Sequence, residues 1–103
     1  MARRGEVWWA LSGGKLRPVL IVSADALNRR IPKVLVVPGT SNIRSWPDEV
    51  VVEGDGFLPQ RTAFCAREVG PIRTSALQTL AGRVPDSMLA QVCATLCNVF
   101  DCR

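Results

Sequence analysis

Two apolar segments that each carry a polar group at one end are the most informative feature of this sequence. Residues 17–23 read Arg-Pro-Val-Leu-Ile-Val-Ser, and Arg17 stands where that run begins. Residues 34–41 read Val-Leu-Val-Val-Pro-Gly-Thr-Ser, with Thr40 and Ser41 where it finishes. If the segments are neighbouring antiparallel strands, the start of one lies beside the end of the other. We therefore expect a guanidinium and a hydroxyl to meet at one rim of a small sheet, in a position to act on a phosphate.

The chemistry open to this rim is limited by the side chains that the sequence lacks. The chain contains no histidine, which excludes imidazole acid–base catalysis and Ser-His-Asp or Cys-His sites. Asp48 and Glu49 would alternate faces at a strand start, which disfavours a two-metal site. A reaction without metal or cofactor remains, in which RNA is cleaved by attack of its own 2′-OH on the adjacent phosphorus. An arginine fork suits the phosphoryl oxygens of such a reaction.

The same residues also have ordinary structural interpretations. Arg17 precedes a proline and could form a salt bridge at a strand start, while Thr40 and Ser41 could be turn hydroxyls after Pro38-Gly39. Trp46 lies beside Arg44 in a polar segment, where an exposed indole could stack an unpaired base, a contact worth roughly 1–3 kcal/mol. The alternative is an indole folded over the mouth of the sheet.

Charge is distributed unevenly along the chain. The formal net charge is +4 over 103 residues, but residues 1–44 carry a net +6 and the remainder carries a net −2. A basic half that contains both polar strand ends fits a polyanionic partner, because phosphate contacts release counterions. Many small basic domains bind no nucleic acid, so charge alone leaves the partner open.

The four cysteines, Cys65, Cys93, Cys97 and Cys102, raise the alternatives of disulfides or a metal site. No apolar signal segment opens the sequence, and no stretch reaches the roughly 18 apolar residues of a membrane span. We therefore expect a cytoplasmic protein without membrane contact, whose thiols pack as small apolar side chains. The last three cysteines lack a CxxC pair, so no structural metal is predicted and their role stays open.

A single domain over residues 1–103 is predicted, made of short strands and one long helix. Strands are expected over 6–11, 17–23, 33–37, 49–53 and 62–68, with a further short one at Ile72; helical turns are expected over 24–30 and 75–80, and a polar loop over 40–47.

The long helix is predicted to follow a polar cap at Pro85-Asp86-Ser87. Its apolar residues recur at three- and four-residue spacing: Met88, Leu89, Val92, Cys93, Leu96, Val99 and Phe100. This stripe could cover the sheet, form a dimer contact, or do both. The whole pattern is typical of a mainly β protein, an SH3-like small β-barrel with short helices and a C-terminal helix.

The sequence resembles the MazF/PemK toxins of bacterial toxin–antitoxin pairs. The Arg-Pro-Val-Leu strand followed by Pro-x-Thr-Ser is the most specific part of the likeness. The likeness runs through Arg4-Gly5-Glu6-Val7-Trp8, residues 17–23, Ala26-Leu27-Asn28, residues 36–42, Gly56-Phe57-Leu58, Leu77 and Gly82.

The resemblance implies a MazF/CcdB-like barrel that forms a homodimer. It also implies a sequence-specific, metal-independent endoribonuclease, which cleaves single-stranded RNA to leave 2′,3′-cyclic phosphate and 5′-OH ends. The family's catalytic arginine falls on Arg17 and its catalytic threonine on Thr40. A cognate antitoxin would occupy the same groove, and an acidic antitoxin tail would suit the basic half of this chain.

The sequence departs from the family pattern in two places. The loop from Ser12 to Leu16 is shorter than usual and lacks the common acidic residue, and Ala76-Leu77 replaces a frequent Arg-Leu pair. Because that loop commonly helps to gate RNA in the family, the cleavage sequence and the RNA class (mRNA, tRNA or rRNA) are not predicted.

These observations favour a ribonuclease toxin that inhibits translation and growth. Arg17 would neutralise the scissile phosphate, and Thr40 would assist the 2′-OH or hold the phosphate. The predicted RNA-binding residues are Lys15, Ser41, Asn42, Arg44, Trp46 and Arg61. One alternative is a non-catalytic toxin on the same fold that poisons a DNA-handling enzyme, as a CcdB-like gyrase poison does. The other is a module that retains only RNA or antitoxin binding.

Overall fold

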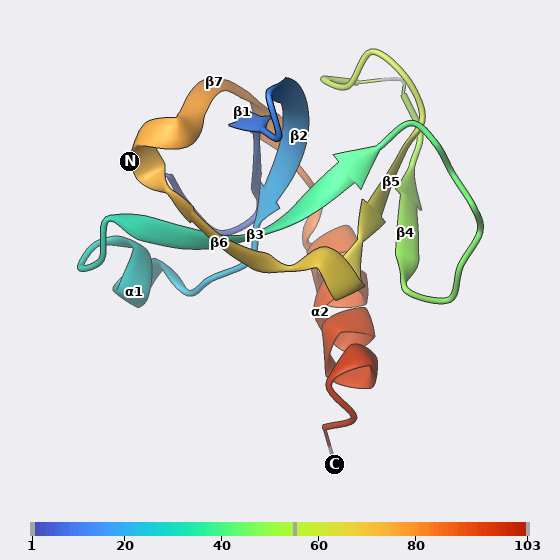
Figure 1. Ribbon diagram of the computed structural model, residues 1–103. Helices are drawn as coiled ribbons and strands as arrows, with labels where there is room; N and C mark the ends of the chain where they lie inside the picture. The colour runs from blue at the N-terminus through green and yellow to red at the C-terminus, as the bar shows by residue number, and fades with distance from the viewer. Residues whose placement is uncertain (1, 55, 103) are drawn as a thin grey trace.

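The computed structural model describes residues 2–54 and 56–102, and in these residues seven strands form one sheet (Figure 1). The strands are β1 (Glu6–Ser12), β2 (Lys15–Ile21), β3 (Lys33–Thr40), β4 (Glu49–Val52), β5 (Thr62–Cys65), β6 (Gly70–Arg73) and β7 (Leu77–Arg83). The α-helices are α1 (Asp25–Asn28) and α2 (Asp86–Val99), and two 3₁₀ turns are η1 (Ala66–Glu68) and η2 (Thr74–Ala76). None of the described helices has the length and apolar character needed to cross a bilayer.

Strand β3 is the centre of the sheet because three other strands pair with it. The sheet runs in the order β4-β5-β3-β2-β1-β7, and β6 also pairs with β3. One edge of β3 pairs with β2, while the other pairs first with β6 and then, at Gly39 and Thr40, with β5. The two ends of this path, β4 and β7, do not pair with each other within the described residues. The predicted mainly β, barrel-like fold with a C-terminal helix is confirmed, as a sheet that does not close.

The central strands are buried on both faces, which explains their continuous apolar sequences. On one face Leu20 and Val37 pack with Phe64 and with Leu89 and Val92 of α2, so the predicted apolar stripe covers the sheet as far as Leu96, whereas Val99 and Phe100 at its end are exposed. The opposite face holds a second cluster, composed of Ala2, Ala10, Val19, Ile21, Val34 and Val36. A strand that must satisfy two cores cannot shift its register by one residue without exchanging both sets of side chains.

The hairpin between β1 and β2 turns in only two residues. Ser12 is paired with Lys15, and Gly13 and Gly14 between them have φ angles of 58° and 76°. Two successive positive φ angles are typical of a type I′ turn, which glycine adopts without steric cost. This turn accounts physically for the short loop seen in the sequence.

Three expectations about local structure were wrong. The segment 75–80 is not a helical turn, because η2 ends at Ala76 and β7 begins at Leu77, where pairing with β1 satisfies its backbone. The strand expected over 62–68 ends at Cys65 and continues as the η1 turn. The N-cap of α2 is Pro85, and no side chain caps the helix. Non-local strand pairing overrode local propensity in the first case.

Gly39 is a buried residue near the end of β3, and replacing it with a larger residue is expected to destabilise the protein. A Cβ at Gly39 would lie 2.7 Å from Cγ2 of Thr62 and 3.1 Å from Cε1 of Phe64. Gly39→Ala should therefore lower the free energy of unfolding by about 1–3 kcal/mol, as overpacked cores do, measured by urea denaturation. The matched control is Gly70→Ala, where the nearest atom would be 3.9 Å away. Equal stability losses in both variants would contradict the packing described here.

Candidate nucleic-acid site at the β2–β3 rim

The start of β2 and the end of β3 lie at the same edge of the sheet. These strands are antiparallel neighbours, as the sequence predicted, and their paired residues run from Ile21 with Val36 to Val19 with Pro38. The ladder ends there, two residues short of Arg17 on β2 and two residues short of Thr40 on β3. Residues two apart on a strand project from the same face. Arg17 therefore shares the face of Val19, and Thr40 shares the face of Pro38, at the same end of the two strands.

The two strands remain close one residue beyond their ladder and then separate. The Cγ atom of Pro18 lies 3.2 Å from the position that a Cβ on Gly39 would occupy. Beyond this point the ribbons of β2 and β3 diverge (Figure 1). Arg17 and Thr40 are each held by a buried chain neighbour, Pro18 after Arg17 and Gly39 before Thr40.

Arg17 and Thr40 differ in how much of their bonding capacity is already used. Arg17 is exposed and makes no hydrogen bond or ion pair with any described residue. Thr40 is half-buried, and its Oγ1 accepts a hydrogen bond from the backbone N–H of Asn42 at 3.1 Å. The hydroxyl of Thr40 keeps its own proton to donate. Both side chains can thus contact an external anion.

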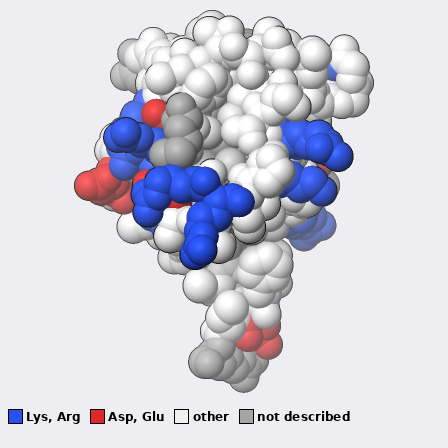
Figure 2. All heavy atoms as spheres, turned by 90° about the vertical axis from the view of Figure 1, so that its left-hand side faces the viewer, with Lys and Arg blue, Asp and Glu red and all other residues white. Residues whose placement is uncertain are grey.

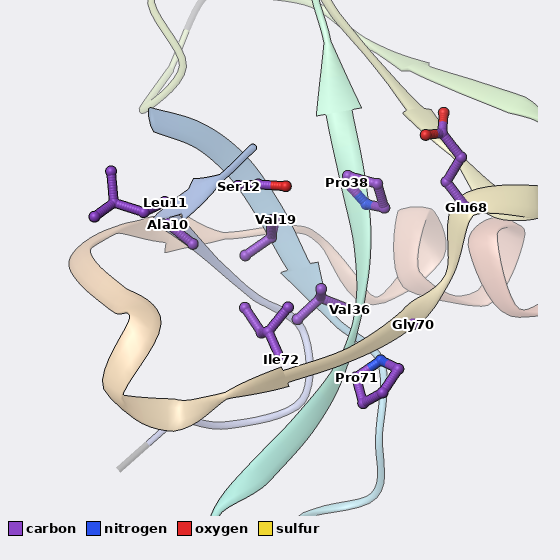
Figure 3. Close-up of a pocket in the computed structure, with 10 residues that line it drawn as sticks. All are labelled: Ala10, Leu11, Ser12, Val19, Val36, Pro38, Glu68, Gly70, Pro71 and Ile72. Atoms are coloured by element: carbon purple, nitrogen blue, oxygen red, sulfur yellow. The ribbon is translucent and has the colours of Figure 1, made fainter. Parts of the chain in front are cut away.

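A hollow of about 160 Å³ opens on the same face (Figure 3); Arg17 and Thr40 are not among its lining residues, but the strand neighbours two residues away from each are. Val19 and Pro38, which share the face assigned to Arg17 and Thr40, line it. Ser12 points across the hollow toward Pro38, and Glu68 stands on the other side of Pro38 (Figure 3). Glu68 was missed at the level of sequence because only the turn η1 brings it beside β3.

The other predicted binding residues fall into two groups. Lys15 begins β2, and Ser41 and Asn42 follow β3, so all three lie near the rim and are exposed. Arg61 is two residues before Ala63, the β5 residue paired with Thr40, and forms an exposed ion pair with Glu53 at 3.0 Å. The remaining two, Arg44 and Trp46, belong to a separate cluster in the β3–β4 loop.

That loop cluster is held together by charge and ring stacking. The guanidinium carbon of Arg44 lies 3.8 Å from the ring centroid of Trp46, and Arg44 Nε is 3.0 Å from Glu49 Oε2. Arg67 approaches the same ring at 5.5 Å and pairs with Asp48 at 3.0 Å. Trp46 is 42% exposed, so it is an exposed indole as expected, but a guanidinium already stacks on it. Arg44 is engaged within the protein before any RNA arrives.

Glu49 is the anion on which this cluster depends. Its side chain is 1% exposed, and its Oε1 accepts the backbone N–H groups of Arg44 and Ser45 at 3.0 and 2.9 Å. Burial alone would raise the pKa of Glu49, but the hydrogen bonds from Arg44 and Ser45 outweigh it and lower the pKa below its ordinary value. Burial raises the pKa of the neighbouring Cys65 thiol.

Basic side chains also gather away from the rim. On the side of the molecule that carries α1, they form two groups separated by uncharged surface (Figure 2). Among the described residues no group of three or more His, Cys, Asp or Glu side chains is arranged to hold a metal ion.

Comparison with known proteins shows the family of this chain. Residues 3–100 match the family model described as "PemK-like, MazF-like toxin of type II toxin-antitoxin system". The Mycobacterium tuberculosis protein named "Probable endoribonuclease MazF5" is 36% identical over 101 residues, covering 96% of this chain and 93% of that protein.

Solved structures show the same fold. The Mycobacterium tuberculosis toxin MazF-mt6 superimposes with a TM-score of 0.85 at 25% identity, over 93% of this chain and 96% of that one. An endoribonuclease from a mycobacterial species, solved in complex with its cognate antitoxin, gives a TM-score of 0.88 at 23% identity, over 100% and 98% of the two chains.

The lowered pKa of Glu49 predicts a pH-dependent loss of stability. A carboxylate with a depressed pKa in the folded state stabilises the protein above its unfolded pKa, and that contribution is lost as pH falls through the folded pKa. Glu49→Gln should therefore be less stable than wild type at pH 7, and the difference should shrink toward pH 3, measured by urea denaturation at each pH.

The matched control for this experiment is Glu53→Gln. Glu53 also pairs with an arginine at 3.0 Å, but both partners are mostly exposed, at 67% and 59%. Exposed pairs contribute little to stability, so this variant should unfold like wild type at both pH values. A stability difference for Glu49→Gln that stays constant with pH would show that the charge of Glu49 is not what holds the loop.

Proposed function

Because the chain belongs to the PemK-like, MazF-like family of toxins from type II toxin–antitoxin systems, we propose that it is an endoribonuclease toxin. Its proposed active site is the β2–β3 rim, and its proposed substrate is single-stranded RNA. The observation that carries this proposal is the state of Arg17: an exposed guanidinium with no hydrogen bond or ion pair to any described residue, at the end of the β2–β3 pair where Thr40 also lies. A cation left unpaired on a rigid strand is suited to bind an anion.

In the proposed reaction the 2′-OH of the RNA attacks the adjacent phosphorus. A P–O2′ bond forms, the P–O5′ bond breaks, and the products carry a 2′,3′-cyclic phosphate and a 5′-OH. Arg17 would donate two hydrogen bonds to the phosphoryl oxygens, whose charge rises in the transition state. Thr40 would hold the same phosphate through its hydroxyl proton.

The proposed reaction also needs a group that accepts the proton of the 2′-OH. Glu68 is the carboxylate that lines the hollow beside the rim, and no described residue forms an ion pair with it. We assign it this role; the leaving 5′ oxygen, on the opposite side of the phosphorus, takes up a proton from water, and Glu68 later releases its proton to water. Lys15, Ser41, Asn42 and Arg61 would guide the strand, and the Arg44–Trp46 pair would contact a base beyond them.

The proposed partners follow from the same family. We propose that a cognate antitoxin covers the rim, because a homologous mycobacterial endoribonuclease was solved with its own antitoxin. A homodimer in the cytoplasm, acting on cellular RNA to arrest growth, is the proposed working form. The net charge of +6 in residues 1–44 favours both an RNA and an acidic antitoxin segment.

Replacing Arg17 tests the active-site assignment. Arg17→Ala should reduce cleavage of single-stranded RNA by roughly 10²–10³-fold, the usual effect of removing one charge-stabilising donor. Cleavage is measured with the purified protein in the presence of a chelator, and the RNA termini are mapped. The matched control is Arg73→Ala, an exposed arginine at the end of β6 whose side chain makes no hydrogen bond or ion pair with the described residues and which lies outside the rim.

The outcomes separate the proposal from its alternatives. Both variants should melt like wild type, because neither arginine is buried. Wild-type cleavage by Arg17→Ala would rule out the rim as the active site. RNA that survives incubation with the wild-type protein would favour a non-catalytic toxin or a binding module on the same fold.

Replacing Glu68 tests the proton acceptor separately. Glu68→Gln keeps the shape of the side chain, so RNA affinity measured by filter binding should stay within about twofold of wild type. The cleavage rate should fall about 10²-fold or more, as loss of a general base does. The control Glu53→Gln should cleave normally. If Glu68→Gln cleaves at the wild-type rate, another group accepts the proton.

A further inference from the structure

The C-terminal end of α2 brings two of the cysteines together through its backbone. Asp101 has a φ of 53°, in the left-handed region, and its N–H donates to the carbonyl of Asn98 at 3.2 Å. The N–H of Cys102 donates to the carbonyl of Cys97 at 2.9 Å. These two bonds and the left-handed residue define a Schellman cap. Cys97 and Cys102 occupy the two positions of this motif whose side chains are commonly in contact.

The hydrogen bond limits how far apart these two residues can be. Bond lengths between the bonded N and O atoms and their α-carbons add to the 2.9 Å separation, so the α-carbons of Cys97 and Cys102 are at most about 7 Å apart. Disulfides usually span α-carbon separations of about 4.4–6.8 Å. Both thiols are exposed, so a reagent can reach them. The cap therefore holds the pair within bridging range on an accessible surface.

The other thiols are less suited to a bridge. Cys93 lies one helical turn before Cys97, and residues four apart on a helix have Cβ atoms about 5–6 Å apart, too far for the roughly 3.5–4.5 Å of a disulfide. The sulfur of Cys93 also accepts a hydrogen bond from Nη2 of Arg4 at 2.8 Å. Cys65 is buried in the sheet.

We propose that Cys97 and Cys102 form a reversible dithiol–disulfide site that closes by exchange with a low-molecular-weight disulfide. The thiolate of Cys97 attacks one sulfur of that disulfide, forms a mixed disulfide and releases one thiolate. The thiolate of Cys102 then attacks the Cys97 sulfur and releases the second. The protein loses two electrons and two protons, and the small disulfide is reduced to two thiols.

Closure would fix the last turn of α2 in its capped form. The bridge spans Phe100, which is 62% exposed, and Asp101, whose left-handed backbone is otherwise disfavoured for a residue with a Cβ. Figure 1 shows this end of α2 projecting away from the sheet, so the bridge would act on the helix end and not on the β2–β3 rim.

The test is thiol counting on the full-length protein. Reduced, desalted protein is incubated with oxidised glutathione, alkylated and weighed intact, and the bridge is located by fragmenting the peptide that follows Arg83. Two of the four thiols should no longer react with the alkylating reagent. After the mass of the added alkyl groups is subtracted, the protein should be lighter than the reduced form by two hydrogen atoms and should carry no glutathione. Cys93→Ser should behave in the same way, whereas Cys97→Ser and Cys102→Ser should keep glutathione attached to the remaining cap thiol.

A denatured control separates the folded geometry from simple nearness in sequence. In urea the Cys93–Cys97 and Cys97–Cys102 bridges should form in similar amounts, because closure entropy changes slowly with loop length. In the native protein the Cys97–Cys102 bridge should exceed the Cys93–Cys97 bridge by about tenfold or more, since the helix holds the latter pair in a strained geometry. Asp101→Gly should keep this preference, and Asp101→Val should weaken it.

Three results would overturn the proposal. The first is a native bridge distribution equal to that in urea. The second is wild-type protein that ends as stable glutathione adducts on Cys97 and Cys102. The third is covalent dimers joined through these cysteines, which would assign them to contacts between chains.

Discussion

The structure depends on the burial of β3, which has paired strands along both edges and an apolar cluster on each face. Pairing along two edges and packing on two faces therefore all constrain the eight residues of β3. A shift of β3 along β2 would break one ladder and expose side chains of both clusters. The relative positions of Arg17 and Thr40 follow from this constraint, because each residue extends a strand whose register is already fixed.

A rim built in this way is preorganised without being buried. Val19 and Val37 are almost fully inaccessible, yet Arg17, two residues before Val19, is exposed. Core packing orders the backbone of this rim, so only the exposed side chains would still have to be ordered if an anion bound there. The Arg44–Glu49 pair holds the backbone of the β3–β4 loop in place, and there the anchor is a buried carboxylate and not an apolar cluster.

The sequence predicts the strands and the rim because their signals are local. Continuous apolar runs ending in Arg17 or Thr40 are readable without any structure, and the family resemblance rests on the same residues. β7 was misread because residues 77–80 have no strong alternation, and only pairing with β1 makes them a strand. The position of Glu68 beside β3 and the partners of Arg44 were not predicted for a similar reason. These contacts are made through the folded chain and produce no recognisable spacing pattern in the sequence.

The two-glycine turn between β1 and β2 leaves room for change at the tip of the hairpin. Among the residues that the structure describes, no atom lies within 4 Å of the position where a side chain on Gly13 or Gly14 would begin, so these residues leave the tip of the hairpin open. Insertions at such a tip cost little folding free energy. The length and charge of this turn can therefore change without altering the register of β1 and β2.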